Sequence, residues 1–212
     1  MNYIRYYDDL KKEMMPNRVF ILYGPRRVGK TFLLNQAQSE FTGRIFYGTG
    51  EDLEIRNILQ SQSVEKIKAA FSSYDWVVID EAQKVDRIGH GLKLAIDHLP
   101  AVRFIATGSS SFELAHQVGE PLTGRKITCT LYPLSSLELK AQLGGAKLMQ
   151  MLDSRLIFGS YPEILTTESN DQKILILKEL RDSYLYKDIL ELDNIRNSKK
   201  ISDLLQLIAW QI

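Results

Sequence analysis

The stretch that most constrains the fold of this chain is "YGPRRVGKTF", residues 23–32. It follows the apolar run "RVFILY" and precedes "FLLNQAQSEF", a segment of helical character. Between Gly24 and Thr31 the residues have the spacing Gly-x-x-x-x-Gly-Lys-Thr, which is the Walker A pattern of a phosphate-binding loop. A glycine turn before a basic helix start is the alternative interpretation. The strand before the loop and the helix after it favour phosphate binding.

Each part of this loop has its own physical role. Gly24 and Gly29 let the backbone turn and approach an anion closely. Successive N–H groups then face inward, and the dipole of the following helix adds to the attraction. Lys30 can reach the β- and γ-phosphates, and the Thr31 hydroxyl can ligate Mg²⁺. We also assign the remaining loop residues and the residue after them to nucleotide binding: Pro25, Arg26, Arg27, Val28 and Phe32. The pattern gives the two arginines no role, so contact with the γ-phosphate, with a neighbouring subunit or with solvent stays open.

A second element of the same chemistry is the acidic pair at the end of "WVVIDE". The apolar run is typical of a buried strand, and its end delivers Asp80 and Glu81 to the edge of the sheet where α/β folds bind ligands. We expect Asp80 to orient Mg²⁺, and Glu81 to orient the attacking water or accept its proton. A kinase of small molecules would not need Glu81 there. The nearest match to a guanine-reading Asn-Lys-x-Asp element, "QKVD" at 83–86, begins with Gln and follows the wrong strand, so guanine specificity is not expected.

Hydroxyl groups follow another apolar run, in "FIATGSSSFEL". A hydroxyl at this edge of the sheet could hydrogen-bond the γ-phosphate or the attacking water. We assign this sensor role to Ser109, with Thr107 as the alternative. Ser110 or Ser111 also suits the N-cap of a following helix. Arg125, in "LTGRKI", is a candidate for neutralising charge in phosphoryl transfer, and a solvated loop arginine is the alternative.

The chain as a whole alternates short apolar runs with helical segments, the pattern of a mostly parallel sheet covered by helices. After residue 134 the pattern is helical only. This part opens with a Ser135-x-x-Glu138 capping box, and Gly144-Gly145 and "GSYP" at 159–162 interrupt it. The expected strands are 18–23, 44–48, 75–80, 102–107 and 126–132, and the expected helices between them are 30–40, 52–60, 63–72, 88–98 and 111–118.

The last twelve residues, "ISDLLQLIAWQI", contain seven large apolar side chains. So many apolar groups on one short helix require burial against something. Either this segment packs back on the helical part, or the chain is a piece of a longer protein. We favour the second interpretation.

Composition and charge exclude several classes of protein. Lys+Arg 27 against Asp+Glu 26 leaves a net charge of +1, so there is no global attraction to nucleic acid. The single Cys129 cannot build a disulfide framework, and the 3 His residues lie too far apart for metal-ligand spacing. The charged N-terminus does not resemble a signal peptide, and no apolar run approaches the ~20 residues of a membrane span. We expect a cytoplasmic protein with no membrane partner.

Together these elements resemble the AAA+ superfamily, and within it the prokaryotic AAA-type ATPases that carry a domain of unknown function after the ATPase core. The matching segments are "GPRRVGKT", "WVVIDEAQ", "ATGSSSFEL", "LTGR", "LYPLS" and "FGSYPEI". The resemblance implies an α/β P-loop fold with a five-stranded, mostly parallel sheet of order 5-1-4-3-2 and a C-terminal helical lid subdomain. It divides the chain into an ATPase core at 1–133, a lid at 134–195 and the start of a truncated winged-helix-like region at 196–212.

The resemblance also implies an activity and partners. Arg125 would be an arginine finger that acts on a neighbouring subunit of a homo-oligomer, and Pro162 would lie near the adenine. A lid arginine of the usual kind is not identifiable. The expected function is Mg²⁺-dependent ATP binding and hydrolysis, coupled to conformational change in a partner or to a DNA-linked process. The alternatives are a nucleotide-dependent switch or DNA-tethering module with slow hydrolysis, and a nucleic-acid motor. The motor is disfavoured because no strand pattern for a second motor domain follows residue 134.

Overall fold

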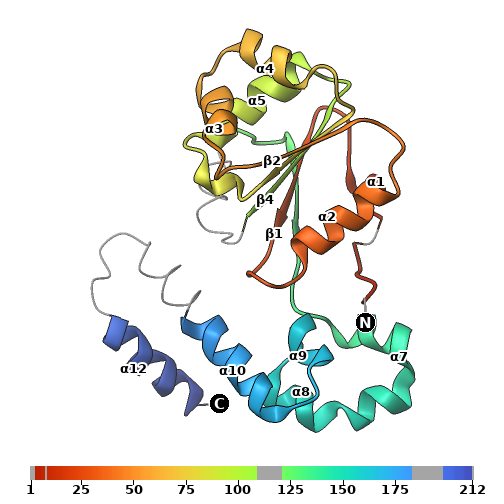
Figure 1. Ribbon diagram of the computed structural model, residues 1–212, viewed down its shortest axis with the longest axis vertical. Coiled ribbons are helices and arrows are strands. Elements are labelled where there is room, and N and C mark those ends of the chain that lie inside the picture. Colours follow the sequence, from red (N-terminus) through yellow and green to blue (C-terminus); the bar gives the residue numbers. More distant parts are fainter. Residues whose placement is uncertain (1–2, 8, 109–120, 183–197, 212) are drawn as a thin grey trace. The chain divides into compact units, whose positions relative to one another are not determined.

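The computed structural model describes residues 3–7, 9–108, 121–182 and 198–211 (Figure 1). A five-stranded sheet forms its centre, in the order β2-β3-β4-β1-β5, and all four strand pairs are parallel. This is the expected order, read from the other edge. The strands are β1 (Val19–Tyr23), β2 (Ile45–Thr49), β3 (Trp76–Asp80), β4 (Arg103–Gly108) and β5 (Lys126–Thr130).

Helices cover both faces of the sheet (Figure 1). They are α1 (Leu10–Glu13), α2 (Lys30–Ser39), α3 (Leu53–Gln60), α4 (Val64–Phe71) and α5 (Ile88–His98). Ile21 and Ile79 belong to the core cluster that contains α3, α4 and α5, whereas Leu22 and Val78 belong to the cluster that contains α1 and α2. Because neighbouring residues of a strand face opposite sides, a sheet covered on both faces needs strands that are apolar throughout.

The strand β5 ends two residues earlier than expected. Leu131 N still donates to Tyr23 O, at 2.7 Å. After Tyr23 the neighbouring strand β1 ends and the phosphate loop begins, so the hydrogen bonds between β1 and β5 do not extend to Tyr132. The expected helix at 111–118 lies outside the residues that the structure describes.

The chain after β5 is helical, as predicted. It forms α7 (Ser136–Gln150), α8 (Leu152–Phe158), α9 (Pro162–Thr166), α10 (Asn170–Leu180) and α12 (Ser198–Ala209). The predicted capping box is present: Glu138 N donates to Ser135 Oγ at 3.2 Å, and Ser135 N donates to Glu138 Oε2 at 2.8 Å. The predicted interruptions are also present, since Gly144 has non-helical backbone angles within α7 and Gly159 ends α8.

Two compact units make up the chain, residues 1–148 and 149–212. The first contains the sheet, its covering helices and most of α7. In the second, α8 and α10 contact each other through Lys173, whose ammonium donates to Ser154 Oγ at 3.2 Å and lies 5.2 Å from the centre of the Phe158 ring. No helix in the described ranges is long and apolar enough to cross a membrane. The apolar side chains expected near the C-terminus include four exposed ones on or beside α12: Leu204, Leu207, Ile208 and Trp210.

Candidate nucleotide-binding site

The phosphate loop leaves β1 and runs directly into α2. A Cβ at Gly24 would lie 2.4 Å from Leu131 O, and Gly29 has φ 103°, so both positions require glycine. The helix α2 has no side-chain N-cap, and the first N–H groups of a helix have no partner within it, which suits an anion. Lys30 is only 7% exposed, and its ammonium donates to Gly24 O at 2.7 Å and to Pro25 O at 3.0 Å. The loop therefore holds its lysine against its own carbonyl groups.

The other loop residues differ in their surroundings. Val28 is fully buried and ties the loop to the core formed with α1 and α2. Arg26 is half-buried, whereas Arg27 is exposed and has a left-handed backbone, with φ 57°. Phe32 is exposed on the first turn of α2.

Asp80 is the centre of a polar cluster at the carboxyl ends of three strands. Its Oδ1 accepts hydrogen bonds from Glu81 N at 3.0 Å and from the Thr107 hydroxyl. Its Oδ2 accepts from Tyr47 OH at 2.9 Å and from Thr31 Oγ1 at 3.4 Å. The two residues that we expected to share Mg²⁺, Thr31 and Asp80, thus lie side by side. A hydroxyl and a carboxylate are oxygen ligands of the kind that Mg²⁺ prefers, so these residues fit the ion.

Glu81 begins a tight turn after the strand. Its backbone is left-handed, with φ 48° and ψ 42°, a conformation that costs about 1 kcal/mol in a residue other than glycine. The Glu81 carboxylate accepts a hydrogen bond from Gln83 Nε2 at 2.5 Å, and Gln83 is only 5% exposed. On the other side, a Cβ at Gly50 would lie 2.3 Å from Glu81 O. The turn is therefore held on two sides, as is common where strained residues serve a function.

Sequence reasoning missed Tyr47 and Gln83. Burial, together with the charge of Asp80, raises the pKa of the Tyr47 phenol, so this group keeps its proton and donates a hydrogen bond to the carboxylate. Thr49 of β2 pairs in register with Asp80 of β3, which brings the end of β2 to the site. The expected strand order already placed these strands side by side, and this was the available signal. Gln83 could have been found only as a polar residue close to Glu81.

Of the two sensor candidates, the structure describes one. Thr107 lies near the end of β4, is fully buried and donates to Asp80. Leu22 of β1 pairs with Thr107 in register, so this hydroxyl lies between the strand that leads into the phosphate loop and the acidic strand. Ser109, Ser110 and Ser111 lie outside the described residues.

Arg125 lies at the opposite end of the sheet from the phosphate loop. Its carbonyl accepts from Val19 N at 2.9 Å, at the start of β1, whereas the loop follows the end of this strand. A strand of five residues spans about 16 Å. The Arg125 guanidinium forms an ion pair with Asp97 of α5. Pro162, the other residue that the resemblance implicated, is the first residue of α9 in the second unit.

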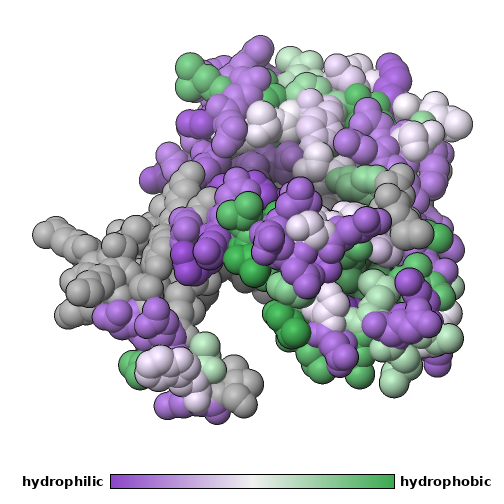
Figure 2. All heavy atoms as spheres, turned by 60° about the horizontal axis from the view of Figure 1, so that its bottom comes forward, coloured by the Kyte–Doolittle hydropathy of each residue, from purple (hydrophilic) through white to green (hydrophobic). Residues whose placement is uncertain are grey.

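A cavity of about 610 Å³ lies beside the phosphate loop. It lies between residues 4–7, the end of β5 and the start of α7. Two of the residues that line it contact the phosphate loop. Leu131 packs against Gly24, and Arg5 donates to Val28 O at 3.2 Å. Apolar residues come to the surface among polar ones on the face shown in Figure 2. Exposed apolar residues that line the cavity include Ile4, Tyr6 and Leu137.

The fold and the geometry of the site define a P-loop nucleotide-binding protein. Residues 16–140 match a family model described as an AAA domain, and residues 149–212 match one described as a domain of unknown function, DUF8612. The chain belongs to the AAA domain family of P-loop ATPases, with a domain of unknown function after the ATPase core. Binding and hydrolysis of a nucleotide are the general activity of this family.

Two known proteins are similar over most of the chain. "Uncharacterized protein MJ1544" of Methanocaldococcus jannaschii is 30% identical over 214 residues, which cover 94% of this chain and 48% of that protein. The chain thus spans about half the length of this relative. The Walker-type ATPase PABY2304 of Pyrococcus abyssi superimposes with a TM-score of 0.57 and 19% identity, covering 90% of this chain and 75% of that one. This likeness confirms the fold.

Proposed function

We propose that the protein binds ATP together with Mg²⁺ and hydrolyses it at the site formed by the phosphate loop and Asp80-Glu81. The observation that carries the proposal is the 3.4 Å contact between Thr31 Oγ1 and Asp80 Oδ2. These residues are 49 positions apart, and their contact brings the loop and the acidic strand end into one site. Thr31 and Asp80 would hold Mg²⁺, which would neutralise charge on the phosphate oxygens.

The residues around the ion supply the rest of the proposed mechanism. Lys30 leaves the carbonyls of Gly24 and Pro25 and binds the β- and γ-phosphates, because a charged acceptor binds an ammonium more strongly than a neutral one. Glu81, oriented by Gln83, orients the attacking water and accepts its proton. The sensor hydroxyl comes from Ser109 or Thr107. The position of Thr107 beside Asp80 supports a role for it in fixing that carboxylate.

The apolar cavity supports a place for the base of the nucleotide. Two of its lining residues, Leu131 and Arg5, contact the phosphate loop at Gly24 and Val28, and its volume falls in the range of small-molecule sites. A planar base would lie against Ile4, Tyr6 and Leu131, burying apolar surface.

Removal of Mg²⁺ tests this proposal. With Mg²⁺, purified protein is expected to release phosphate from ATP, and excess EDTA is expected to lower the rate at least about 100-fold, because the metal stabilises charge that develops on the phosphate oxygens. The measurement is steady-state phosphate release. Adding Mg²⁺ beyond the EDTA should restore the rate. Turnover that is the same in EDTA would remove the metal from the proposal.

Partners form a less direct part of the proposal. We propose a homo-oligomer in which Arg125 acts on the site of a neighbouring subunit. The position of Arg125, far from the loop of its own chain, supports action in trans. We also propose that hydrolysis is coupled to conformational change in a partner or to a DNA-linked process. This chain covers 48% of its relative from Methanocaldococcus jannaschii, so the coupling is a proposal about the whole protein.

The concentration dependence of turnover tests the role of Arg125. ATP turnover per subunit should rise with protein concentration, and Arg125→Ala should lower the plateau at least about 100-fold, since arginine fingers contribute 10³–10⁵ to catalysis. Arg18→Ala is the matched control, because Arg18 is exposed and lines the same surface pocket as Arg125. A turnover per subunit that is flat with concentration and unchanged in Arg125→Ala would make the arginine a surface residue.

A further inference from the structure

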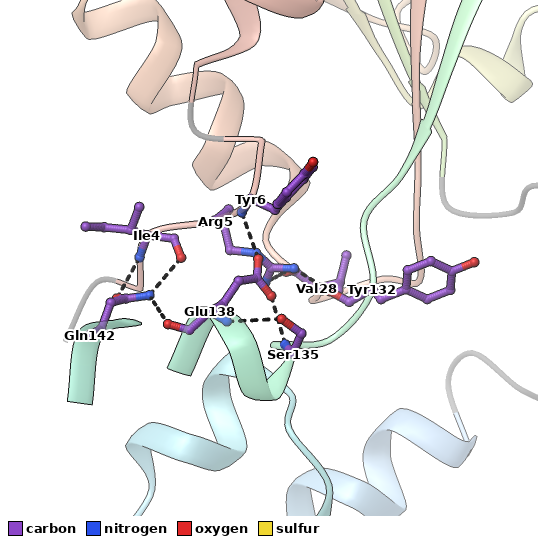
Figure 3. Close-up of polar contacts among 8 residues, drawn as sticks. All are labelled: Ile4, Arg5, Tyr6, Val28, Tyr132, Ser135, Glu138 and Gln142. Atoms are coloured by element: carbon purple, nitrogen blue, oxygen red, sulfur yellow. Dashed lines mark hydrogen bonds and ion pairs between the residues drawn. The ribbon is translucent and has the colours of Figure 1, made fainter. Parts of the chain in front are cut away.

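A single buried arginine near the N-terminus joins three parts of the first unit (Figure 3). Arg5 is 6% exposed. Its Nη1 donates to Val28 O of the phosphate loop at 3.2 Å, and its Nη2 donates to Tyr132 O after β5. Its Nε forms an ion pair with Glu138 Oε1 of α7 at 3.1 Å. One planar guanidinium thus binds the loop, the end of the sheet and the first helix that follows it.

The charges in this contact are well compensated. Burial lowers the pKa of Arg5, while Glu138 favours the charged guanidinium. Burial opposes the charge of Glu138, but hydrogen bonds from Ser135 N and Tyr6 N, together with Arg5, hold its pKa below the ordinary value. A buried ion pair often contributes little net stability compared with apolar residues of the same volume. Net stability is therefore a weak explanation for this buried ion pair. The stronger explanation is that the pair fixes the positions of the groups that it contacts.

That geometry acts on one peptide group of the phosphate loop. A peptide is planar and trans, so the N–H of Gly29 points in the direction opposite to the C=O of Val28. Arg5 holds this carbonyl on its own side, which turns the Gly29 N–H away from Arg5. Gly29 has φ 103° and no Cβ, so the Val28–Gly29 peptide can change its orientation more easily than a peptide that precedes another residue. A constraint from outside the loop is most effective at such a position.

We propose that Arg5 is a positioning residue for the phosphate loop, which fixes the Val28–Gly29 peptide so that the Gly29 N–H donates to the bound phosphate chain. This inference rests on the proposed binding of ATP at the loop. The N-terminal segment, residues 3–7, thereby helps to form the anion site. Arg5 acts through Val28 and does not itself contact the phosphates.

A second contact of the same segment provides a control. Gln142 exchanges two hydrogen bonds with the backbone of Ile4, each of 2.8 Å, and lies four residues after Glu138 on the same side of α7 (Figure 3). Gln142 therefore holds the segment on α7 as Arg5 does. Figure 3 draws no contact between Gln142 and Val28. Loss of Gln142 loosens the segment, whereas loss of Arg5 also releases the loop carbonyl.

The experiment compares Arg5→Gln with Gln142→Ala in the full chain, using inorganic tripolyphosphate with Mg²⁺ as the probe. Tripolyphosphate has no base, so its binding does not depend on contacts between a base and the cavity wall. Arg5→Gln is expected to weaken its binding at least about tenfold, the equivalent of 1.4 kcal/mol. Gln142→Ala is expected to stay within about twofold of the wild type. Calorimetry measures the affinity, and thermal unfolding confirms that both variants are folded.

Two further readouts keep the test decisive. The Gly29 amide proton should shift downfield on binding in the wild type and should not shift in Arg5→Gln. If Arg5→Gln does not fold, Glu138→Gln is the substitute. It keeps Arg5 but removes its charged partner, and it should weaken binding by a factor between those of the other two variants.

The inference and the proposed function fail in different ways. If the wild type binds neither ATP nor tripolyphosphate, the proposed function is wrong. If the wild type binds both, and a folded Arg5→Gln binds tripolyphosphate as tightly, the inference alone is wrong. Equal losses in Arg5→Gln and Gln142→Ala would also overturn it, because they would show that only the attachment of the segment matters.

Discussion

Lys30→Ala is expected to weaken ATP binding at least about 100-fold, so that binding disappears from an ordinary titration. The Lys30 ammonium is buried at the start of α2 and already lies within the loop, against two of its carbonyl groups. Hydrogen bonds between an ammonium and a phosphate are charge-assisted and about twice as strong as neutral ones. Loss of Lys30 removes this interaction and leaves part of the phosphate charge uncompensated.

The control for this variant is Lys93→Ala on α5, because Lys93 is exposed and belongs to no part of the proposed site. Calorimetric titration of ATP with Mg²⁺ measures both variants. The control should bind as the wild type does. Unimpaired binding by Lys30→Ala would show that the loop does not hold the phosphates.

Glu81→Gln is expected to bind ATP normally and to hydrolyse it at least about 100-fold more slowly, the scale of the loss of a general base. The glutamine has nearly the same shape, and its amide oxygen can still accept the hydrogen bond from Gln83 that now reaches the Glu81 carboxylate. The left-handed turn at this position should therefore survive. What is lost is a group able to take a proton from water.

For this variant the matched control is Glu65→Gln, an exposed glutamate in the first turn of α4. Steady-state phosphate release and ATP affinity should be measured on the same preparations. Separation of binding from turnover would identify Glu81 as acting in the chemical step. Turnover equal to that of the wild type would remove Glu81 from the mechanism.

Much of the fold was predictable because its signals are local in the sequence. The run that forms β1 is apolar throughout, the run that forms β3 is apolar up to Asp80, and the capping box of Ser135 and Glu138 sets the start of α7. The strand order followed from the family resemblance, since apolar runs do not state which strands are neighbours. The helix α1 was missed because its four residues are too few to show a helical period.

The site divides in the same way. Gly24 to Thr31 and Asp80-Glu81 are continuous motifs, so the sequence alone brought them into view. Tyr47 and Arg5 act through contacts with residues distant in the sequence, and neither belongs to a motif. Tyr47 meets Asp80 only because β2 lies beside β3, and Arg5 meets Val28 only after the chain has folded. Contacts of this kind depend on tertiary packing, which no local pattern encodes.

The most direct test of the central claim is a single-turnover measurement with γ-labelled ATP, Mg²⁺ and an excess of the wild-type protein. The expected result is that the labelled ATP is converted completely to ADP and free phosphate. Under the same conditions Glu81→Gln should hold the ATP intact. If the wild type binds the ATP and leaves it uncleaved over the same period, the protein is not an ATPase by itself, and the claim that Asp80-Glu81 and the phosphate loop form a hydrolytic site is contradicted.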